Sequence, residues 1–547
     1  MVFFPTLLLS LFITIALIPV FARLAVRLQA VDVPDGVRKI HTQPVPRTGG
    51  IAMVLGAFIP VIFWIPLGSF VRAILIGVAI LGMIGLVDDF SRLGYRAKFA
   101  GQIAAALVMV FYGGVKIEYL GALLPENVLV PTWVSIPLTV LVIVGVTNAI
   151  NLSDGLDGLA GGICLLCFSC IGYLGYLADN STVTLLAVAV VGAIFGFLRF
   201  NTYPATLFMG DTGSQFLGFL AASLSLALTQ GNQLFSALLP LIILGFPVLD
   251  TMAVMLERVT EGRSPFMPDR NHFHHKLIRL GFYHSEAVVI IYVLQAFLVT
   301  SAFIFRFHSE WVLMIEYLVF SSLILATFYL AGRTGWRFKR TDLLDEVIKG
   351  KLRELRERGV VIKACFRVVK IGLPSLIFLI CLVPSKVPEY TAWIALSLVG
   401  VVGASWFFKT EWLGGSLRLA LYLSIPLVVY LGEVSPAVWS DGRLMQLYHL
   451  SFGALVLFVI LTLRFTRRKR GFRSTPMDFL ILFIALVVPN LPDEQIRSYH
   501  MGLVAAEIVM VFFSYEVLLG ELRGELKKVS VVTMCALGLI VVRGVVG

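Results

Sequence analysis

Acidic and amide side chains gather in three short motifs that lie between long apolar runs. Asp88 and Asp89 end one apolar run, Asp211 lies in MGDTGS at 209–214, and the motif TNAINLSDGLDGL contains Asn148, Asn151, Asp154 and Asp157. Carboxylate oxygens suit Mg²⁺ or Mn²⁺ better than zinc. Magnesium usually binds through one or two carboxylates together with the phosphates of a substrate. These motifs therefore indicate metal-assisted chemistry on a phosphate.

Basic and imidazole side chains occupy two further polar segments. They are Lys39, His41 and Arg47 in KIHTQPVPRTGG, and Arg263, Arg270, His272, His274, His275 and Lys276 in GRSPFMPDRNHFHHKL. Such side chains hold phosphate oxygens and spread the negative charge that develops during transfer. Carboxylates facing basic loops predict a phosphate-bearing substrate and a phosphoryl-type transfer.

Each motif also has a structural interpretation. Asp88 and Asp89 could be a charge pair at a membrane surface, and the glycines of 155–162 could serve helix packing alone. The three histidines of 272–275 lack the companions of a zinc site. His449 and His500 have no comparable neighbours in the sequence and are expected to be structural or interfacial. What favours chemistry is that all the motifs are expected on one side of a membrane.

The composition requires that membrane. Of the 547 residues, 58% are hydrophobic and only 14% are charged, and the mean hydropathy is +0.91. A soluble globular protein carries about 25% charged residues, so most of this surface must face lipid. The net charge is +11, and the residues that carry it lie in short segments between apolar runs. This pattern excludes nucleic acid as a partner and predicts that the basic segments lie on the cytoplasmic side of the membrane.

Runs of about 20 apolar residues predict membrane spans, and the fold class is an all-α polytopic helical bundle. Eleven spans are predicted in a first group, at 3–22, 50–68, 71–87, 99–114, 133–150, 159–178, 183–200, 213–229, 234–253, 286–305 and 312–331. Seven follow at 371–384, 391–408, 417–432, 445–463, 477–491, 500–519 and 529–546. The first span is expected to be uncleaved.

Lys and Arg residues set the orientation. With the N-terminus outside, most of the 44 Lys and Arg residues fall in cytoplasmic segments, together with every polar motif described above. The long polar break at 333–370 has apolar residues at helical spacing and predicts an amphipathic helix over 341–358. It divides the chain into a catalytic core at 1–335, a cytoplasmic linker at 336–370, and a C-terminal module at 371–547 of unknown role.

Four motifs, in order, resemble those of a known family. DDF at 88–90, NAINLSDGLDGLAGG at 148–162, MGDTGS at 209–214 and DRNHFHH at 269–275 are similar to the motifs of the polyprenyl-phosphate N-acetylhexosamine-1-phosphate transferases of glycosyltransferase family 4. The resemblance covers residues 1 to about 335. The loop that contains the histidines resembles the branch that uses UDP-GlcNAc or related N-acetylhexosamine donors more closely than it resembles the pentapeptide branch. The seven C-terminal spans depart from the family core.

The resemblance implies a role for each motif. Asp211 would be the principal ligand of Mg²⁺ (or Mn²⁺), and Asn151 would be a second metal-binding residue. The catalytic residues would be Asp88, Asp89, Asp154 and Asp157. Substrate would be bound by Lys98, at the lipid phosphate, and by Asn148, Arg270, His272, His274, His275, Lys39 and His41.

The implied reaction moves N-acetylhexosamine-1-phosphate, most simply GlcNAc-1-phosphate, from a UDP-sugar to undecaprenyl phosphate and releases UMP. The implied location is a bacterial inner membrane, with the active site in the cytoplasm. A homodimer and an association with downstream glycan-assembly enzymes both remain open. So do two alternative functions, a phospho-MurNAc-pentapeptide transferase and, from a different class, a flippase for lipid-linked sugars.

Overall fold

The computed structural model describes residues 3–28, 31–32, 45–91, 93–125, 128–230, 234–264, 271–338, 360–408, 412–436, 442–465, 501–521 and 526–546. Within these ranges the chain is helical apart from loops, one 3₁₀ turn (η1, Gly121–Leu123) and two short strands, β1 (Val31–Asp32) and β2 (Val45–Pro46), which pair antiparallel. The prediction of an all-α membrane protein is confirmed.

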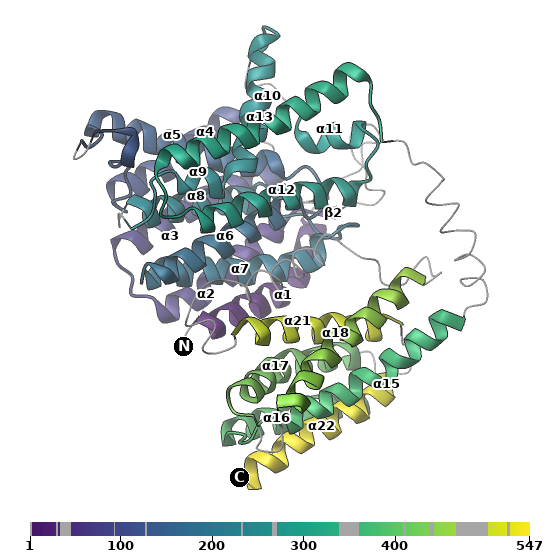
Figure 1. The fold of residues 1–547 in the computed structure, drawn as a ribbon. Helices are drawn as coiled ribbons and strands as arrows, with labels where there is room; N and C mark the ends of the chain where they lie inside the picture. Colours follow the sequence, from purple (N-terminus) through teal and green to yellow (C-terminus); the bar gives the residue numbers. More distant parts are fainter. Residues whose placement is uncertain are drawn as a thin grey trace. The chain divides into compact units, whose positions relative to one another are not determined.

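The described helices form two compact units. The first contains α1 (Phe3–Arg27), α2 (Gly49–Trp64), α3 (Ser69–Ser91), α4 (Tyr95–Phe111), α5 (Thr132–Ser153), α6 (Leu159–Leu177), α7 (Ser181–Asn201), α8 (Gly210–Gln230), α9 (Leu239–Ile243), α10 (Gly245–Thr260), α11 (Phe273–Arg279), α12 (His284–Ile304) and α13 (Glu310–Thr334) (Figure 1). The second contains α15 (Val360–Leu382), α16 (Glu389–Phe408), α17 (Leu413–Val434), α18 (Gly442–Phe465), α21 (Met501–Glu521) and α22 (Leu526–Val546).

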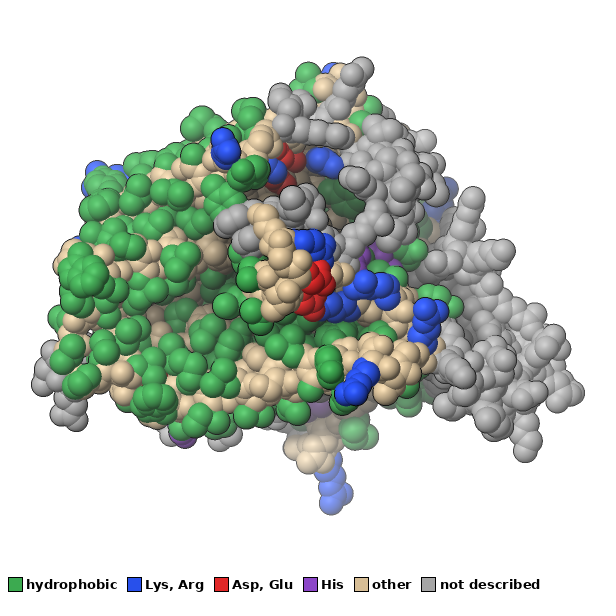
Figure 2. Space-filling model, turned by 90° about the horizontal axis from the view of Figure 1, so that it is seen from above, with side chains coloured by type: hydrophobic (Ala, Val, Ile, Leu, Met, Phe, Trp, Pro, Cys, Tyr) green, Lys and Arg blue, Asp and Glu red, His purple; other side chains and the backbone are tan. Residues whose placement is uncertain are grey.

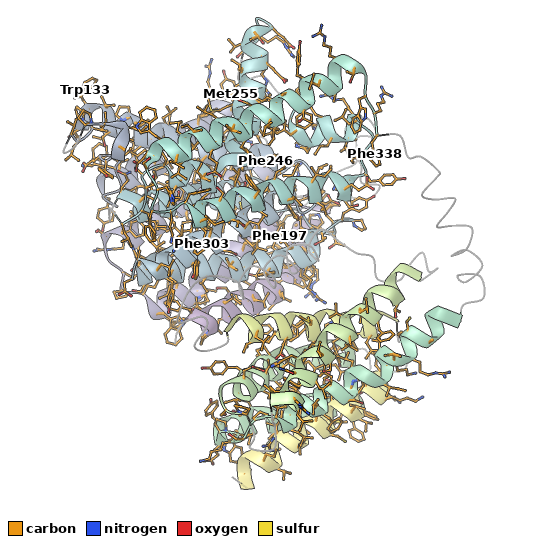
Figure 3. The ribbon with its side chains drawn as sticks, in the orientation of Figure 1. Trp133, Phe197, Phe246, Met255, Phe303 and Phe338 are labelled. Atoms are coloured by element: carbon orange, nitrogen blue, oxygen red, sulfur yellow. The ribbon has the colours of Figure 1, made fainter. Side chains whose placement is uncertain are left out.

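Thirteen of the described helices are long and apolar enough to cross a membrane. Their lipid-facing character is visible in exposed apolar side chains such as Trp133, which is 78% exposed and lies at the periphery, whereas the buried Phe197 lies inside the bundle (Figure 3). In Figure 2, hydrophobic side chains cover most of the visible described surface.

Several predicted spans differ from the helices observed. The span predicted at 50–68 is the shorter helix α2, and the span predicted at 99–114 is α4, which begins at Tyr95 and therefore includes Lys98. The span predicted at 477–491 lies outside the described residues, as does the amphipathic segment 341–358. Helix α15 begins at Val360, so the last part of the predicted linker 336–370 belongs to a helix instead.

The span predicted at 234–253 is broken into α9 and α10. Pro240 and Pro247 cannot donate backbone hydrogen bonds. The break frees carbonyl groups, which in a membrane must find partners inside the protein. The amide of Gln295 donates to the carbonyl of Ile243 at 2.7 Å, and the hydroxyl of Tyr317 donates to that of Gly245 at 2.9 Å. After the break α10 stands across α12 and α13 (Figure 1).

Helix α8 lies at the centre of the first unit, with 94% of its span buried. Its neighbours approach through glycines. A Cβ on Gly85 of α3 would lie 2.6 Å from the backbone nitrogen of Thr212, and one on Gly218 would lie 2.6 Å from the Cα of Thr147 on α5. This close packing fixes the N-terminus of α8, and with it Asp211, against the ends of α3 and α5.

Candidate active site

Three charged side chains meet where α3 ends and where α4 and α8 begin. The ammonium of Lys98 lies 2.8 Å from Oδ2 of Asp88 and also forms an ion pair with Asp211. All three side chains are partly buried, with Lys98 24% exposed. The structure thus brings together three predicted site residues from motifs up to 123 residues apart. An ammonium between two carboxylates can also bind a phosphate, because phosphate oxygens can replace a carboxylate as its hydrogen-bond acceptor.

Asp89 holds the N-terminus of α8. Its Oδ1 accepts the backbone N–H of Asp211 at 3.1 Å, and its Oδ2 accepts the hydroxyl of Thr212 at 3.2 Å. Gly210 is in the left-handed region, with φ of 67°, and a Cβ there would stand 2.5 Å from the same Oδ2. A carboxylate at a helix N-terminus satisfies free backbone donors. Asp89 therefore positions Asp211, and its predicted catalytic role stays a prediction.

Asp154 caps the C-terminus of α5 and lies close to the other carboxylates. Burial, together with the negative charges of Asp211, Asp157 and Asp89, raises the pKa of Asp154 to about 7, and the positive charge of Arg47 partly opposes this rise. One turn earlier, Asn151 accepts a hydrogen bond from the hydroxyl of Ser214 at 2.8 Å, which ties α5 to α8. Asn148 lies on the same end of α5.

The turn between α5 and α6 is held from several sides. The backbone N–H of Asp157 donates to Nε2 of His284 at 3.0 Å, and its Oδ2 accepts the N–H of Ala205 at 2.9 Å. Gly158, with φ of 80°, donates to the side-chain oxygen of Asn201 and accepts the hydroxyl of Tyr292. These bonds fix the turn that carries Asp154, and one carboxylate oxygen of Asp157 is used in fixing it.

The histidines lie against the same turn. His272 begins α11, and its Nδ1 lies 2.9 Å from Oδ2 of Asp250, whose other oxygen accepts the N–H of Phe273 at 2.7 Å. The ring of His274 packs on the backbone of Gly155. Burial, together with the neighbouring His275, His272 and His284, lowers the pKa of His274 to about 2. His274 is therefore neutral and can bind a substrate by hydrogen bonding, not by charge.

Phe246 and Phe273 connect this histidine segment to α10. Their ring centroids lie 5.7 Å apart, and Phe246 is seen in the interior near the broken helix (Figure 3). Three other predicted substrate-binding residues, Lys39, His41 and Arg270, lie outside the described residues.

Two residues of the site were missed from the sequence. Asp250 orients His272, and it is an ionisable residue inside a predicted span, which by itself marks a functional position. His284 holds the Asp157 turn, and only its place at the end of the histidine-rich loop could have indicated it.

The site carries more negative than positive charge. Asp88, Asp89, Asp154, Asp157 and Asp211 influence one another electrostatically, and Lys98 and Arg47 are the cations that interact with them in the described part of the site. Such a donor set fits a divalent cation. The described aspartates do not bring three ligand atoms within 4.8 Å of one another, so an ion held here would take further ligands from a substrate, as magnesium does.

An apolar groove leads to these carboxylates. It has a volume of about 640 Å³ and is lined by α1, α2 and α3, with apolar side chains that include Leu24, Phe58, Ile62 and Met83. Thr48 and Thr212 are the polar side chains of its lining. Because the Thr212 hydroxyl donates to Asp89, one end of the groove lies at the carboxylate cluster.

Comparisons with known proteins agree with this arrangement. The sequence profile described as Glycosyl transferase family 4 matches residues 71–229. The chain is 34% identical over 304 residues to the "Probable undecaprenyl-phosphate N-acetylglucosaminyl 1-phosphate transferase" of Bacillus subtilis (strain 168), covering 55% of this chain and 84% of that protein. It is 31% identical over 367 residues to the "Undecaprenyl-phosphate alpha-N-acetylglucosaminyl 1-phosphate transferase" of Escherichia coli (strain K12), covering 64% and 96%.

A third similar protein comes from a different group of bacteria. The "Decaprenyl-phosphate N-acetylglucosaminephosphotransferase" of Mycolicibacterium smegmatis is 34% identical over 321 residues, which cover 51% of this chain and 78% of that protein. The three matches leave a large part of this chain uncovered.

Proposed function

The chain belongs to glycosyl transferase family 4, and on that basis we propose that it transfers N-acetylglucosamine-1-phosphate from UDP-GlcNAc to undecaprenyl phosphate, forming polyprenyl-diphospho-N-acetylglucosamine and UMP. The observation that carries the proposal is the meeting of Asp88, Lys98 and Asp211 at the end of an apolar groove. It offers a phosphate-binding cation and acidic groups beside a place for a lipid chain.

The proposed transfer exchanges one phosphoanhydride bond for another. An oxygen of the acceptor phosphate bonds to the β-phosphorus of UDP-GlcNAc, and the bond from that phosphorus to the oxygen bridging the two phosphates breaks. UMP leaves with that oxygen, and the anomeric bond of the sugar is untouched. Lys98 would hold the acceptor phosphate. Asp88, whose carboxylate lies 2.8 Å from the Lys98 ammonium, would take up a proton from that phosphate. Direct attack and a covalent intermediate are both compatible with these residues.

The acceptor chain has a place in the groove between α1, α2 and α3. Its lining is almost wholly apolar, which suits a prenyl chain and not a sugar nucleotide. Thr212 at one end would set the phosphate of the lipid close to Asp89 and Lys98. The donor would then approach from the turn at 154–158 and the histidine segment.

A Mg²⁺ ion fits the excess of carboxylates, with Asp211 as the ligand best placed to hold it. When bound, such an ion neutralises phosphate charge during transfer. Ser214 and Asn151 fix the start of α8 against α5, and Asp89 holds the backbone at Asp211. Ser214 and Asp89 would thus keep the Asp211 carboxylate in place, and the role of Asn151 as a second metal-binding residue stays a prediction.

We place the site on the cytoplasmic face of a bacterial inner membrane, because the predicted topology puts the site on the side of the membrane that carries most of the Lys and Arg residues. Gly94→Cys, in the loop beside Lys98, should be protected from a membrane-impermeant thiol reagent in intact cells. Labelling from outside would contradict this orientation. A homodimer or a complex with downstream glycan-assembly enzymes stays a prediction.

The activity is tested with purified full-length protein, undecaprenyl phosphate and a panel of UDP-GlcNAc, UDP-GalNAc, UDP-glucose and UDP-MurNAc-pentapeptide. UMP release and the mass of the lipid product are measured. UMP with UDP-GlcNAc supports the proposal, and UMP with the pentapeptide donor alone would reassign the branch. No UMP with any donor would favour the flippase alternative.

A further inference from the structure

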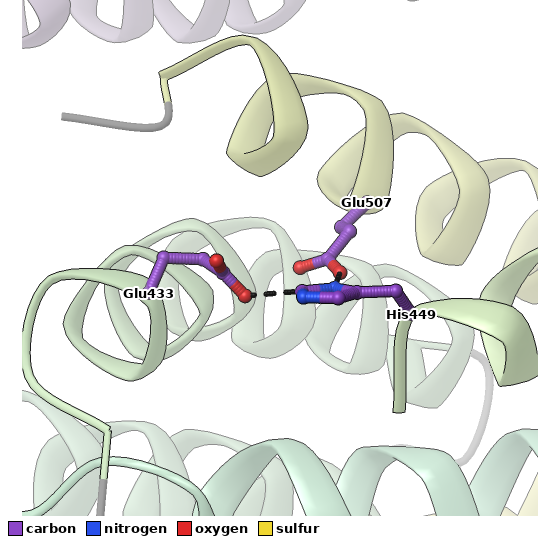
Figure 4. A group of neighbouring side chains, drawn as sticks. All are labelled: Glu433, His449 and Glu507. Carbon is purple, nitrogen blue, oxygen red and sulfur yellow. Dashed lines mark hydrogen bonds and ion pairs between the residues drawn. The ribbon is translucent and has the colours of Figure 1, made fainter. Parts of the chain in front are cut away.

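A second polar cluster lies in the second unit and contains no residue of the transferase motifs. It contains Glu433 from α17, His449 from α18 and Glu507 from α21, one side chain from each helix (Figure 4). Nδ1 of His449 lies 2.7 Å from Oε1 of Glu507 and 3.8 Å from Oε1 of Glu433. The sequence around His449 did not indicate these two neighbours, and its expected structural or interfacial role stays a prediction.

The two carboxylates are buried and only partly satisfied. The side chains of Glu433 and Glu507 are 4% and 2% exposed. Oε1 of Glu433 and Oε2 of Glu507 have no hydrogen-bond partner among the described residues, and both carboxylates face the imidazole (Figure 4). A buried carboxylate with an unpaired oxygen is costly in an apolar surrounding. The cluster therefore lacks positive charge where the two carboxylates converge.

We propose that Glu433, His449 and Glu507 bind a divalent transition-metal ion, with Zn²⁺ as the best fit. One imidazole nitrogen and two carboxylate oxygens form a three-ligand set that leaves one tetrahedral position open. An imidazole ligand disfavours Mg²⁺ and Ca²⁺, which prefer oxygen. The three helices supply one ligand each, so a bound ion would cross-link α17, α18 and α21.

The distances allow an ion with little movement. Ligand atoms about 2.0–2.2 Å from a tetrahedral zinc ion lie about 3.3–3.5 Å from one another. The observed separations from Nδ1, 2.7 Å and 3.8 Å, fall on either side of that value, and all three ligand atoms lie within 4.8 Å of one another. Shifts of less than about 1 Å, within the reach of side-chain rotation, would complete the geometry.

Charge balance also favours an ion. A divalent ion that displaces the Nδ1 proton leaves a neutral imidazole, two carboxylates and two positive charges, which sum to zero. The displaced proton leaves to bulk water, and the His449 side chain, 27% exposed, is the ligand through which an ion would reach the site.

The role follows from the position of the ligands in the helices. Glu433 is next to the last residue of α17, while His449 and Glu507 lie in the second turns of α18 and α21. In the predicted topology these helix ends face the outside, opposite the proposed transferase site. The ion would thus stabilise the C-terminal unit and would not take part in transfer.

The test uses full-length protein stripped with a chelator and then dialysed against ZnCl₂. Zinc per chain is measured by mass spectrometry, and Co²⁺ replaces Zn²⁺ to give an absorption spectrum of the ligand set. The wild-type protein should bind one more Zn²⁺ per chain than the Glu433→Gln and Glu507→Gln variants bind. Glu389→Gln, an exposed glutamate on α16, is the matched control and should bind as wild type does.

Two further arms keep the result interpretable. Asp211→Asn should retain the additional Zn²⁺, because the ion would be bound outside the transferase site. Zn²⁺ should also raise the unfolding temperature of wild type and Glu389→Gln but not of Glu507→Gln, since an ion that binds only the folded state stabilises it. Equal zinc content in wild type and both Gln variants, or a Co²⁺ spectrum without imidazole coordination in wild type, would overturn the proposal even if a variant fails to fold.

Discussion

Gly155 packs directly on the imidazole of His274, so that a side chain at position 155 would overlap with Nε2 of the ring. The contact joins the turn that carries Asp154 and Asp157 to the helix that carries the histidines. The two segments are far apart in the sequence, and their joint geometry depends on a residue without a Cβ.

Gly155→Ala should displace His274 or the turn and lower kcat/KM. Small displacements of positioning groups cost up to about 100-fold in rate, and we expect a loss of about 10- to 100-fold. Gly145→Ala is the control, because Gly145 lies on α5 with open space around its Cβ position. Activity is measured as UMP release from equal amounts of the two purified variants. Equal activity would show that the contact between Gly155 and His274 does not contribute to catalysis.

Lys98→Gln removes the ammonium between Asp88 and Asp211. Loss of a preorganised charge at a transfer site typically costs about 10²–10³ in rate, and the KM for undecaprenyl phosphate should rise because the ammonium is proposed to bind it. Lys116→Gln, which changes a lysine paired with Glu118 away from the site, should leave both parameters unchanged. An unchanged KM for the lipid with a lowered kcat would place Lys98 at the donor instead.

Asp211→Asn should raise the Mg²⁺ concentration needed for half-maximal activity and lower the maximal rate. The amide keeps the shape of the side chain but lacks the negative charge that a hard cation prefers. The measurement is a Mg²⁺ titration of UMP release after chelation, with Asp179→Asn, in the loop between α6 and α7, as the control. Full turnover of wild type after exhaustive chelation would reject the metal proposal outright.

The pKa of Asp154, raised to about 7 by burial and by neighbouring carboxylates, gives a pH dependence. The raised pKa means that the carboxyl is neutral below about pH 7 and ionised above it. If the ionised form works, kcat/KM should rise with pH up to about 7, by about tenfold per unit on the acid limb, and then level off.

Arg47 lowers the pKa of Asp154, so Arg47→Gln should move the inflection to higher pH. Asp154→Asn should abolish it. A profile of the Asn variant with the same inflection as wild type would assign the titration to another group.

The sequence predicted the site best where motifs lie at helix ends. The hydropathy pattern places the segments of Asp88, Lys98 and Asp211 on one side of the membrane. Because helix ends on the same side can approach one another, the sequence indicated that these residues could share a site. The orientation of His272 by Asp250 could not be predicted, because it depends on the break at Leu244, which turns α10 across its neighbours.

The Glu433–His449–Glu507 cluster shows a second limit of sequence patterns. His449 and Glu507 are 58 residues apart, and neither lies in a sequence motif that would indicate a partner. Their proximity depends on which helices of the second unit pack together, and amphipathic periodicity does not determine that within lipid, where every helix face is apolar.

The last prediction concerns the catalytic independence of the first unit. A protein cut after Phe338 should insert and release UMP at the rate of the full-length protein, because every described residue of the proposed site precedes that point. Phe338 donates its N–H to the carbonyl of Leu280 at 2.8 Å, and its ring stacks on Phe282 with centroids 5.0 Å apart (Figure 3). A cut after Gly335, which ends α13, removes those contacts and should give a less heat-stable protein with the same initial rate. Both proteins are compared with the full chain for monodispersity and for UMP release per molecule. A monodisperse 1–338 protein without activity would mean that the C-terminal unit completes the site.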